Sequence, residues 1–358
     1  MRILFKTSYL DDLRLFQHAG QVLWYGALAL CLLVAPLLLA EFYVGELSQI
    51  FILAIAGVGL MLLIGFTGLV SLGHGAFLAI GAYTNTYLIT KGVPFLIAFP
   101  LAGLAALLAG IIIAVPANRM TGIYLAIATL AFSQIVEQLV IRWEPVTRGF
   151  QGMPVPAPDL FGYPLNRGWE FYYLCLAVLA LVVLAAINLV RSPTGRAMVA
   201  MRDSEISAQS LGVNLFRYKT TVFALSAGIT GLAGALLGHK MRFISPDAFN
   251  ILLSIQLLLM VVVGGLGSIH GAILGAIFVG GLPQAIALTR DYLPTVIART
   301  PGLEPGLFGL VMVLIVLFEP LGIYGRWLKL KAYFDYFPLY RRATFKRQRS
   351  YLKTERVR

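Results

Sequence analysis

Charged side chains are scarce in this 358-residue sequence, where Asp, Glu, Lys and Arg together make up 12% of the residues. Soluble domains carry about 25% charged residues. The chain is instead 59% hydrophobic, with a mean hydropathy of +0.84. This balance leaves too little polar surface to cover a water-soluble globule, so it excludes that class. It predicts a polytopic membrane protein, whose apolar surface is solvated by lipid.

Cysteine and histidine are also sparse. Cys31 and Cys175 both lie inside apolar runs, which argues against a disulfide framework or a thiolate metal site. The four histidines are scattered singly, without metal-ligand spacing. No paired carboxylates, no Ser/His/Asp grouping and no H-E-x-x-H sequence are present, so we expect neither a catalytic residue nor a metal site. Transport or channel function is therefore expected, rather than an enzyme.

A phosphate-binding motif and a cleavable signal peptide are missing as well. No G-x-x-x-x-G-K-[ST] sequence occurs, so the chain is not expected to hold ATP or another cofactor itself. The glycines of the Gly264-Gly265-x-Gly267 sequence precede an apolar run and are expected to break a helix. The first apolar run begins around residue 22 and lacks an A-x-A exit, unlike a signal peptide.

Long apolar runs are what the sequence has in abundance, and a spanning helix needs about 20 such residues. The third and eighth runs are rich in glycine and polar residues, so we expect them to be broken or re-entrant. The predicted fold is an all-α polytopic integral membrane protein with about ten transmembrane helices. The candidate spans are residues 22–40, 47–67, 69–90, 95–115, 121–142, 169–190, 220–239, 251–267, 270–289 and 306–325.

The net charge of +12 is concentrated in a few places. Twenty of the 28 Lys and Arg residues lie before Trp24, at Arg119, in residues 191–219 and in residues 326–358. The positive-inside rule places such segments in the cytoplasm. Ten spans that start inside put all four segments on that side, so the charge count and the span count agree.

Three regions follow from this topology: a cytoplasmic N-terminal segment (1–21), a transmembrane domain (22–325) and a basic cytoplasmic tail (326–358). The tail lacks a nucleic-acid-binding motif, so no nucleic-acid partner is expected. We interpret it as a topology anchor against the anionic headgroups of the membrane lipid.

Residues 191–219 form a polar segment between apolar runs, and their capping residues predict two short helices. Ser192 and Pro193 suit the N-cap and first position of one helix. Asp203 or Ser204 can cap a second helix, with Glu205 in its first turn. Gly212 then suits the left-handed position after the helix, and Asn214 helps to turn the chain back. Such a compact element on the cytoplasmic face predicts a docking site.

A few polar residues inside the spans are candidates for a substrate pathway, because polar groups are costly in hydrocarbon. Thr129, Ser133 and Glu137 follow at i, i+4 and i+8 on one helix stripe, which must face water or partner helices. A solvated vestibule and a substrate contact are both open for Glu137. Ser71 and His74 either line the pathway or hold helices together by hydrogen bonds.

Small residues recur at three- and four-residue steps from Ala224 to Gly238. In a bilayer such residues allow two helix backbones to approach closely, so we expect them to pack helices rather than to bind substrate.

Several longer sequences resemble one family, the integral-membrane permease subunits of ABC importers for branched-chain amino acids. The resemblance covers about residues 45 to 325. In that superfamily a cytoplasmic loop carries an E-A-A-x-x-x-G pattern, and here Ala208 and Gly212 match it while Glu205 stands one place early. The stretches that carry the resemblance are G-F-T-G-L-V-S-L-G-H-G-A-F (65–77), G-I-Y-L-A-I-A-T-L-A-F (122–132), T-R-G-F-Q-G-M-P-V-P (147–156), S-P-T-G-R-A-M-V-A-M-R-D-S-E-I-S-A-Q-S-L-G-V-N (192–214), A-L-S-A-G-I-T-G-L-A-G-A-L (224–236), I-S-P-D-A-F (244–249) and V-V-V-G-G-L-G-S-I-H-G-A (261–272).

This resemblance implies an M-type subunit of a type II ABC importer in a bacterial inner membrane, with both termini in the cytoplasm. A second homologous permease subunit would complete the pathway. Two cytoplasmic ATPases would bind the ATP, and a periplasmic or lipid-anchored binding protein would deliver the substrate. The ATPase-coupling loop would be residues 191–219, with its contacts among Arg202, Asp203, Glu205, Ser207, Ala208 and Gly212.

Other functions remain open at this point. The same architecture could import urea, short amides or aromatic acids. A secondary transporter driven by Na⁺ or H⁺ would need intramembrane carboxylates, for which Glu137 is the single candidate. A channel or membrane scaffold is a third class.

Overall fold

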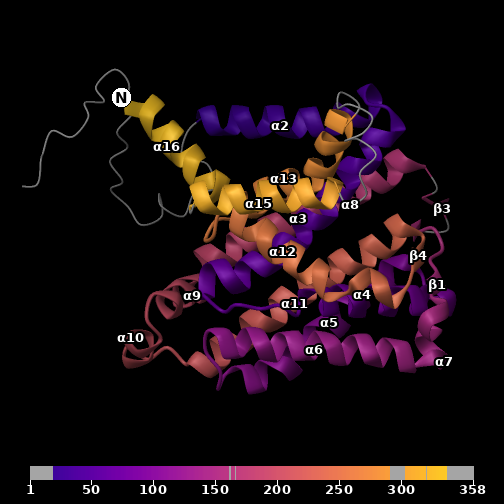
Figure 1. Ribbon diagram of the computed structural model, residues 1–358, viewed down its shortest axis with the longest axis horizontal. Helices are drawn as coiled ribbons and strands as arrows, with labels where there is room; N and C mark the ends of the chain where they lie inside the picture. Colours follow the sequence, from indigo (N-terminus) through magenta and orange to yellow (C-terminus); the bar gives the residue numbers. More distant parts are fainter. Residues whose placement is uncertain (1–18, 161–162, 166, 291–302, 320, 337–358) are drawn as a thin grey trace, which may run out of the picture.

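The computed structural model describes residues 19–160, 163–165, 167–290, 303–319 and 321–336 (Figure 1). Almost all of this part is helical, as predicted. The long helices of the bundle are α3 (Glu41–Thr67), α5 (Phe95–Ala117), α6 (Ile123–Arg142), α8 (Gly168–Arg191), α11 (Leu215–Met241) and α13 (Ile269–Arg290). The other helices of 14 residues or more are α2 (Ala19–Leu38), α4 (His74–Thr90), α12 (Ile251–Gly264), α15 (Leu303–Phe318) and α16 (Gly322–Tyr336).

The predicted count of ten spans is not confirmed. In the described part of the chain, seven helices are long and apolar enough to cross a membrane, with α12 counted together with the 3₁₀ turn η2 (Pro246–Phe249). An eighth span results if α15 and α16, which meet at a bend of 48°, count as one. Each predicted range contains a helix, but α4 and the apolar part of α2 have 17 residues each.

The predicted breaks lie where the glycines are. Gly68 adopts φ +73° after α3, so the third predicted span starts with irregular backbone and α4 begins only at His74. Gly264 ends α12 and Gly265 and Gly267 follow with positive φ, which confirms the helix break expected there. The tenth predicted span, residues 306–325, covers most of α15 and the start of α16, and the bend between these two helices was not predicted. Helix α16 then continues into residues assigned to the tail, whose remainder (337–358) lies outside the described residues, as do residues 1–18.

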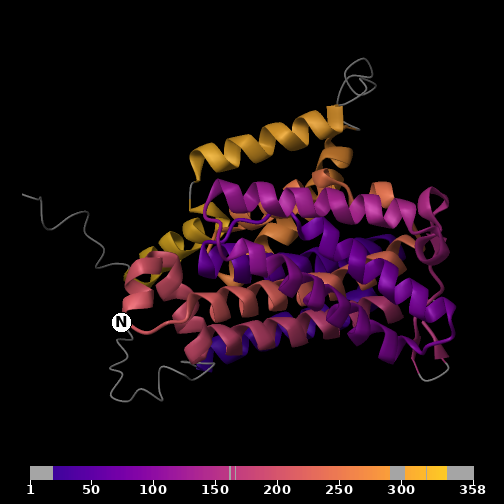
Figure 2. The ribbon, with the colours of Figure 1, turned by 90° about the horizontal axis from the view of Figure 1, so that it is seen from below.

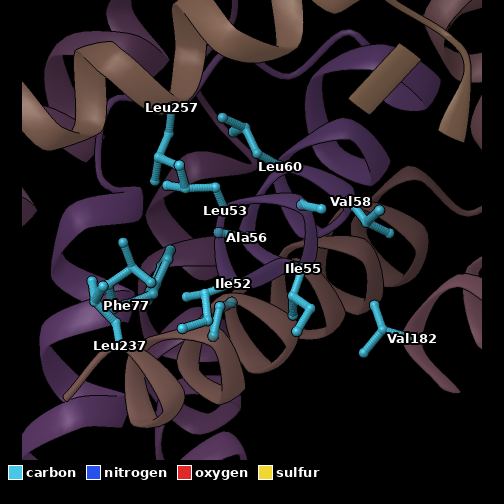
Figure 3. Close-up of a cluster of buried hydrophobic side chains, with 14 of the residues drawn as sticks. Ile52, Leu53, Ile55, Ala56, Val58, Leu60, Phe77, Val182, Leu237 and Leu257 are labelled. Atoms are coloured by element: carbon cyan, nitrogen blue, oxygen red, sulfur yellow. The ribbon is translucent and has the colours of Figure 1, made fainter. Parts of the chain in front are cut away.

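Helix α3 forms the centre of the bundle. It is apolar on every side, as expected of a helix that neighbours surround. Figure 3 shows Ile52, Ile55 and Leu60 of α3 among side chains from four other helices: Phe77 of α4, Val182 of α8, Leu237 of α11 and Leu257 of α12.

Small residues bring α11 against α4 and α5, as the sequence predicted. A Cβ atom added at Gly234 would collide with the backbone carbonyl of Leu78 in α4. At Gly228 it would lie 3.2 Å from Cβ of Leu107 in α5. Because the hydrophobic effect does not drive helices together in lipid, the van der Waals contacts of these closely packed backbones stabilise the association.

The two ends of the bundle differ. One end carries the short helices α9 (Pro193–Asp203) and α10 (Glu205–Ser210), drawn at the left of Figure 1. The other end carries α7 (Glu144–Thr147), the 3₁₀ turn η1 (Gly149–Gln151) and four two-residue strands. These are β1 (Met153–Pro154), β2 (Asp159–Leu160), β3 (Tyr163–Pro164) and β4 (Phe243–Ile244).

The sides on which the loops lie agree with the charge distribution. β1 pairs antiparallel with β4, so the predicted outward loops 143–168 and 240–250 meet at one end. Arg119 shares a surface pocket with Glu205 and Lys219 of the opposite end, and both views place that end away from the strands (Figures 1 and 2). Two of the basic segments therefore lie on one side of the membrane-spanning bundle.

Candidate functional site

Residues 191–219, which we call the coupling loop after the role predicted for them, are held in shape by three caps. Ser192 accepts a hydrogen bond from the Gly195 N–H at the start of α9, and Ser204 accepts one from the Ser207 N–H at the start of α10. Ser192 fits its predicted role, and Ser204 rather than Asp203 is the second cap. Asn214, expected to turn the chain, caps the following helix α11.

Two contacts fix the coupling loop to the bundle. Arg202 donates from Nη1 to the carbonyl oxygen of Gly65 at 3.1 Å, at the last turn of α3, while Asp203 accepts from its Nε. Lys219 of α11 lies 2.7 Å from the Glu205 carboxylate, and the Lys219 side chain is 6% exposed. Glu205, which stands one place early relative to the E-A-A-x-x-x-G pattern, therefore forms an ion pair within this chain. These contacts make the loop and the ends of α3 and α11 one unit.

The free surface of this unit is apolar at its tip. Ile206 and Leu211 are 84% and 82% exposed, and Ser207 is exposed beside them, while Ala208 is buried and anchors α10. Gly212 has φ +86° and open space around its Cβ position, so backbone conformation rather than packing requires a glycine there.

Ser71 and His74 belong to a hydrogen-bonded chain inside the bundle, which we call the His74 network. Ser71 Oγ lies 3.1 Å from His74 Nδ1, and His74 Nε2 lies 2.9 Å from Ser226 Oγ in α11. Ser226 in turn donates to the carbonyl oxygen of Gly59 in α3 at 2.6 Å. His74 is fully buried. Of the two roles left open by the sequence, the geometry fits hydrogen bonding between helices.

Thr129 is also occupied by structural contacts. Its hydroxyl accepts from the Leu72 N–H at 2.9 Å and donates to the Ala126 carbonyl at 2.9 Å. It thus ties α6 to the irregular segment before α4.

Ser133 and Glu137 lie differently from Thr129, although all three share the predicted stripe. Both line a small cavity between α6, α4 and η2, which we call the Tyr83 cavity. The Tyr83 hydroxyl is buried and has no hydrogen-bond partner among the described residues. The other lining residues are Ala76, Ala79, Val136, Val140, Pro246 and Phe249. The cavity therefore combines an apolar wall with a carboxylate and two hydroxyls.

The exposed face of α6 beside the cavity carries two glutamines among apolar residues. Gln134 donates to Glu137 Oε2 at 3.3 Å, and Gln134 and Gln138 are exposed on the outside of the bundle. Polar side chains at membrane depth face water or partner helices rather than lipid. This face of α6 is therefore the surface that fits a pathway or a second subunit.

Two hydrogen bonds of His239 were not predicted from the sequence. Asn85 donates to His239 Nε2 at 2.8 Å, and His239 Nδ1 lies 2.9 Å from the Pro156 carbonyl, which ties the outward loop to the bundle. Tyr83 and Lys219 were also missed. Lys219 directly precedes the predicted span 220–239, whereas Tyr83 lies inside the predicted span 69–90 without a signal of its own. Among the described residues, no group of three His, Cys, Asp or Glu is placed to hold a metal ion.

Comparison with known proteins agrees with this architecture. Residues 42–316 match the family model described as branched-chain amino acid transport system / permease component. The chain is 35% identical over 331 residues to the high-affinity branched-chain amino acid transport system permease protein LivM of Salmonella typhimurium, covering 85% of this chain and 75% of that one. It is 36% identical to the LivM protein of Escherichia coli, covering 78% and 69%.

A more distant relative is the ribose import permease protein RbsC of Haemophilus influenzae, 25% identical over 68% of this chain and 76% of that one. No solved structure matches the chain. The family match spans most of the bundle, from the first turn of α3 to α15, and includes both the coupling loop and the Tyr83 cavity. The chain therefore belongs to the family of branched-chain amino acid transport system permease components.

Proposed function

We propose that this chain is the M-type permease subunit of an ATP-driven importer for branched-chain amino acids. It forms half of the translocation pathway and receives movement from cytoplasmic ATPases through α9 and α10. The observation that carries this proposal is the coupling loop, a doubly capped pair of helices whose base is fixed to α3 and α11 while Ile206 and Leu211 remain exposed. The names of the LivM relatives support the substrate class.

The rest of the assembly follows from the same surfaces. Two ATPases bind ATP in the cytoplasm, one of them against the tip of α10. A second, homologous permease subunit packs beside the exposed face of α6, where Gln134 and Gln138 require a partner other than lipid. A periplasmic or lipid-anchored binding protein delivers the amino acid to the end that carries β1 and β4.

The membrane in which it acts is the bacterial inner membrane, with both termini in the cytoplasm. Figure 1 draws the end of α16 on the same side as α10, which supports a cytoplasmic C-terminus.

The test is uptake of radiolabelled leucine into proteoliposomes that contain this chain with its neighbouring permease, ATPases and binding protein. We expect uptake that requires ATP, and its absence from an assembled complex would overturn the proposal. Within this assay, Ile206→Glu places a charge in the ATPase interface and is expected to reduce uptake at least about tenfold, as for an interface hot spot. Ile206→Leu is the matched control and keeps near-normal uptake.

Gly212 provides a second test of coupling. Gly212→Ile forces a β-branched residue into the left-handed region, at a cost of about 1–2 kcal/mol, and should uncouple ATP hydrolysis from uptake. Asn tolerates this region better, so Gly212→Asn should retain coupling. Equal ratios of leucine imported to ATP hydrolysed in the two variants would contradict a role for the loop conformation.

A further inference from the structure

The Tyr83 cavity lies in the half of the bundle remote from the coupling loop. Glu137 stands in the second half of α6, which ends at Arg142, and η2 directly follows the strand β4 at the outward end. The cavity is thus on the side where a binding protein would release its cargo.

Its size and lining select one kind of group. The cavity measures about 10 Å³, which is about the space that a single water-sized group fills. Glu137 supplies a carboxylate at its edge, and Gln134 hydrogen-bonds one oxygen of that carboxylate. Tyr83 adds a buried hydroxyl whose hydrogen-bonding capacity is unused among the described residues. Asp247 follows the lining residue Pro246 in the sequence, and no Lys, Arg or His is among the residues that line the cavity.

A primary ammonium group matches these properties. It has the size of a water molecule, donates up to three hydrogen bonds and carries the charge that a carboxylate attracts. A carboxylate ligand would be repelled by Glu137, and a neutral apolar group would leave the Tyr83 hydroxyl without a partner. An ionisable residue at membrane depth is moreover the kind that marks a substrate path.

We propose that the Tyr83 cavity is the first ammonium subsite of the pathway, where Glu137, Tyr83 and Ser133 receive the α-amino group of the incoming amino acid. The apolar side chain of the substrate then lies outside the cavity, along the exposed face of α6. This inference rests on the proposed function, because it assigns a site to the amino acids that the importer carries. It also gives the pathway a means to distinguish amino acids from carboxylic acids of the same shape.

The test measures leucine uptake and ATP hydrolysis in proteoliposomes of the complete importer. Glu137→Gln keeps the shape and removes the charge, and we expect uptake to fall about tenfold, the size of effect expected for one charge-assisted hydrogen bond. Glu137→Asp should fall between Glu137→Gln and the wild type, and Tyr83→Phe should reduce uptake a few-fold. Hydrolysis stimulated by the binding protein should stay within about twofold in each variant, which shows that the complex is assembled and its coupling loop intact. Glu144→Gln, which removes an exposed carboxylate at the same end, is the matched control and should not change uptake.

Wild-type leucine uptake separates the failure of this inference from failure of the proposed function. If the wild-type importer carries leucine and Glu137→Gln carries it equally fast, the cavity holds water only and the inference is wrong. If wild-type uptake disappears when Na⁺ and NH₄⁺ salts are replaced by choline, the cavity binds an inorganic cation and the assignment to substrate is also wrong. If the wild type carries no leucine, the proposed function itself fails.

Discussion

The His74 network and the Tyr83 cavity are two sets of polar side chains within the same bundle, and they differ in whether their atoms have partners. In the network, each hydroxyl and ring nitrogen from Ser71 to Ser226 has a partner, and the chain of bonds ends on the Gly59 carbonyl. In the cavity, the Tyr83 hydroxyl has none among the described residues, and Glu137 is half-buried at the edge. Polar residues at membrane depth thus serve either to join helices or to receive a ligand, and hydrogen-bond saturation distinguishes the two roles.

Removing the ring of His74 should give the largest loss of stability. His74→Ala leaves a cavity and deprives two hydroxyls of their partner, which we expect to lower the free energy of unfolding by about 2–4 kcal/mol. Denaturation of the purified protein in mixed micelles measures it. His74→Phe fills the volume without the hydrogen bonds and should recover part of the loss. If His74→Ala is as stable as the exposed control Gln138→Ala, the hydrogen bonds of His74 do not stabilise the bundle, and His74 belongs with the residues of the Tyr83 cavity instead.

The ion pair of the coupling loop should behave like the network, as a saturated contact. Glu205→Ala leaves the nearly buried ammonium of Lys219 without its partner. The expected cost is about 1–2 kcal/mol, since Glu205 is partly exposed and solvent weakens the pair. Adding Lys219→Met should restore most of the stability, because no unpaired charge then remains. If the double variant is less stable than Glu205→Ala alone, Lys219 stabilises the protein through contacts other than its ion pair with Glu205.

Two serines allow the comparison to be made with the same substitution. Ser226→Ala removes a donor and an acceptor from the His74 network and should cost about 1 kcal/mol. Ser133→Ala removes a hydroxyl that lines the cavity and should change stability by less than about 0.5 kcal/mol. Unfolding curves of the two proteins under one condition measure the difference. Equal losses of stability would show that hydrogen-bond saturation does not distinguish the His74 network from the residues of the Tyr83 cavity.

The smallest effect on stability is expected at Tyr83, and its sign is informative. Tyr83→Phe removes a buried hydroxyl that lacks a partner, so the free energy of unfolding should stay unchanged or rise by up to about 1 kcal/mol. The same variant should import leucine more slowly. A clear loss of stability would mean that the hydroxyl has a structural partner, such as a buried water molecule.

Local features of the chain were predictable because neighbouring residues decide them. Ser192 and Ser204 cap helices by accepting hydrogen bonds from N–H groups three residues away, and Gly212 and Gly265 adopt the positive φ angles that glycine allows. The predicted grouping of the loops at two ends of the bundle agrees with the structure, since β1 pairs with β4 and Arg119 lines one pocket with Glu205.

The functional assignment of polar residues was less predictable. The same argument made five residues candidates for the pathway, because a polar side chain inside a membrane span is costly unless it contacts water or another helix. These residues are Ser71, His74, Thr129, Ser133 and Glu137. The partners of His74 and Thr129, which are Ser226 and Leu72, lie 152 and 57 residues away in the sequence. No local pattern reports a contact of this range, so sequence alone could not divide the set.

The sequence by itself determined that the chain spans a membrane, that glycine-rich segments interrupt two of its helical runs, and that residues 192–214 form two short capped helices. These properties follow from hydrophobicity, glycine and capping side chains, whose effects extend over a few residues. Only the tertiary structure decided that α3 is the centre and that Glu205 pairs with Lys219. It also decided that Tyr83 lines a cavity and has a buried hydroxyl without a partner among the described residues, while both ring nitrogens of His74 are hydrogen-bonded. The physical reason is that burial and hydrogen-bond partners are set by which helices meet, and that is a property of the whole bundle.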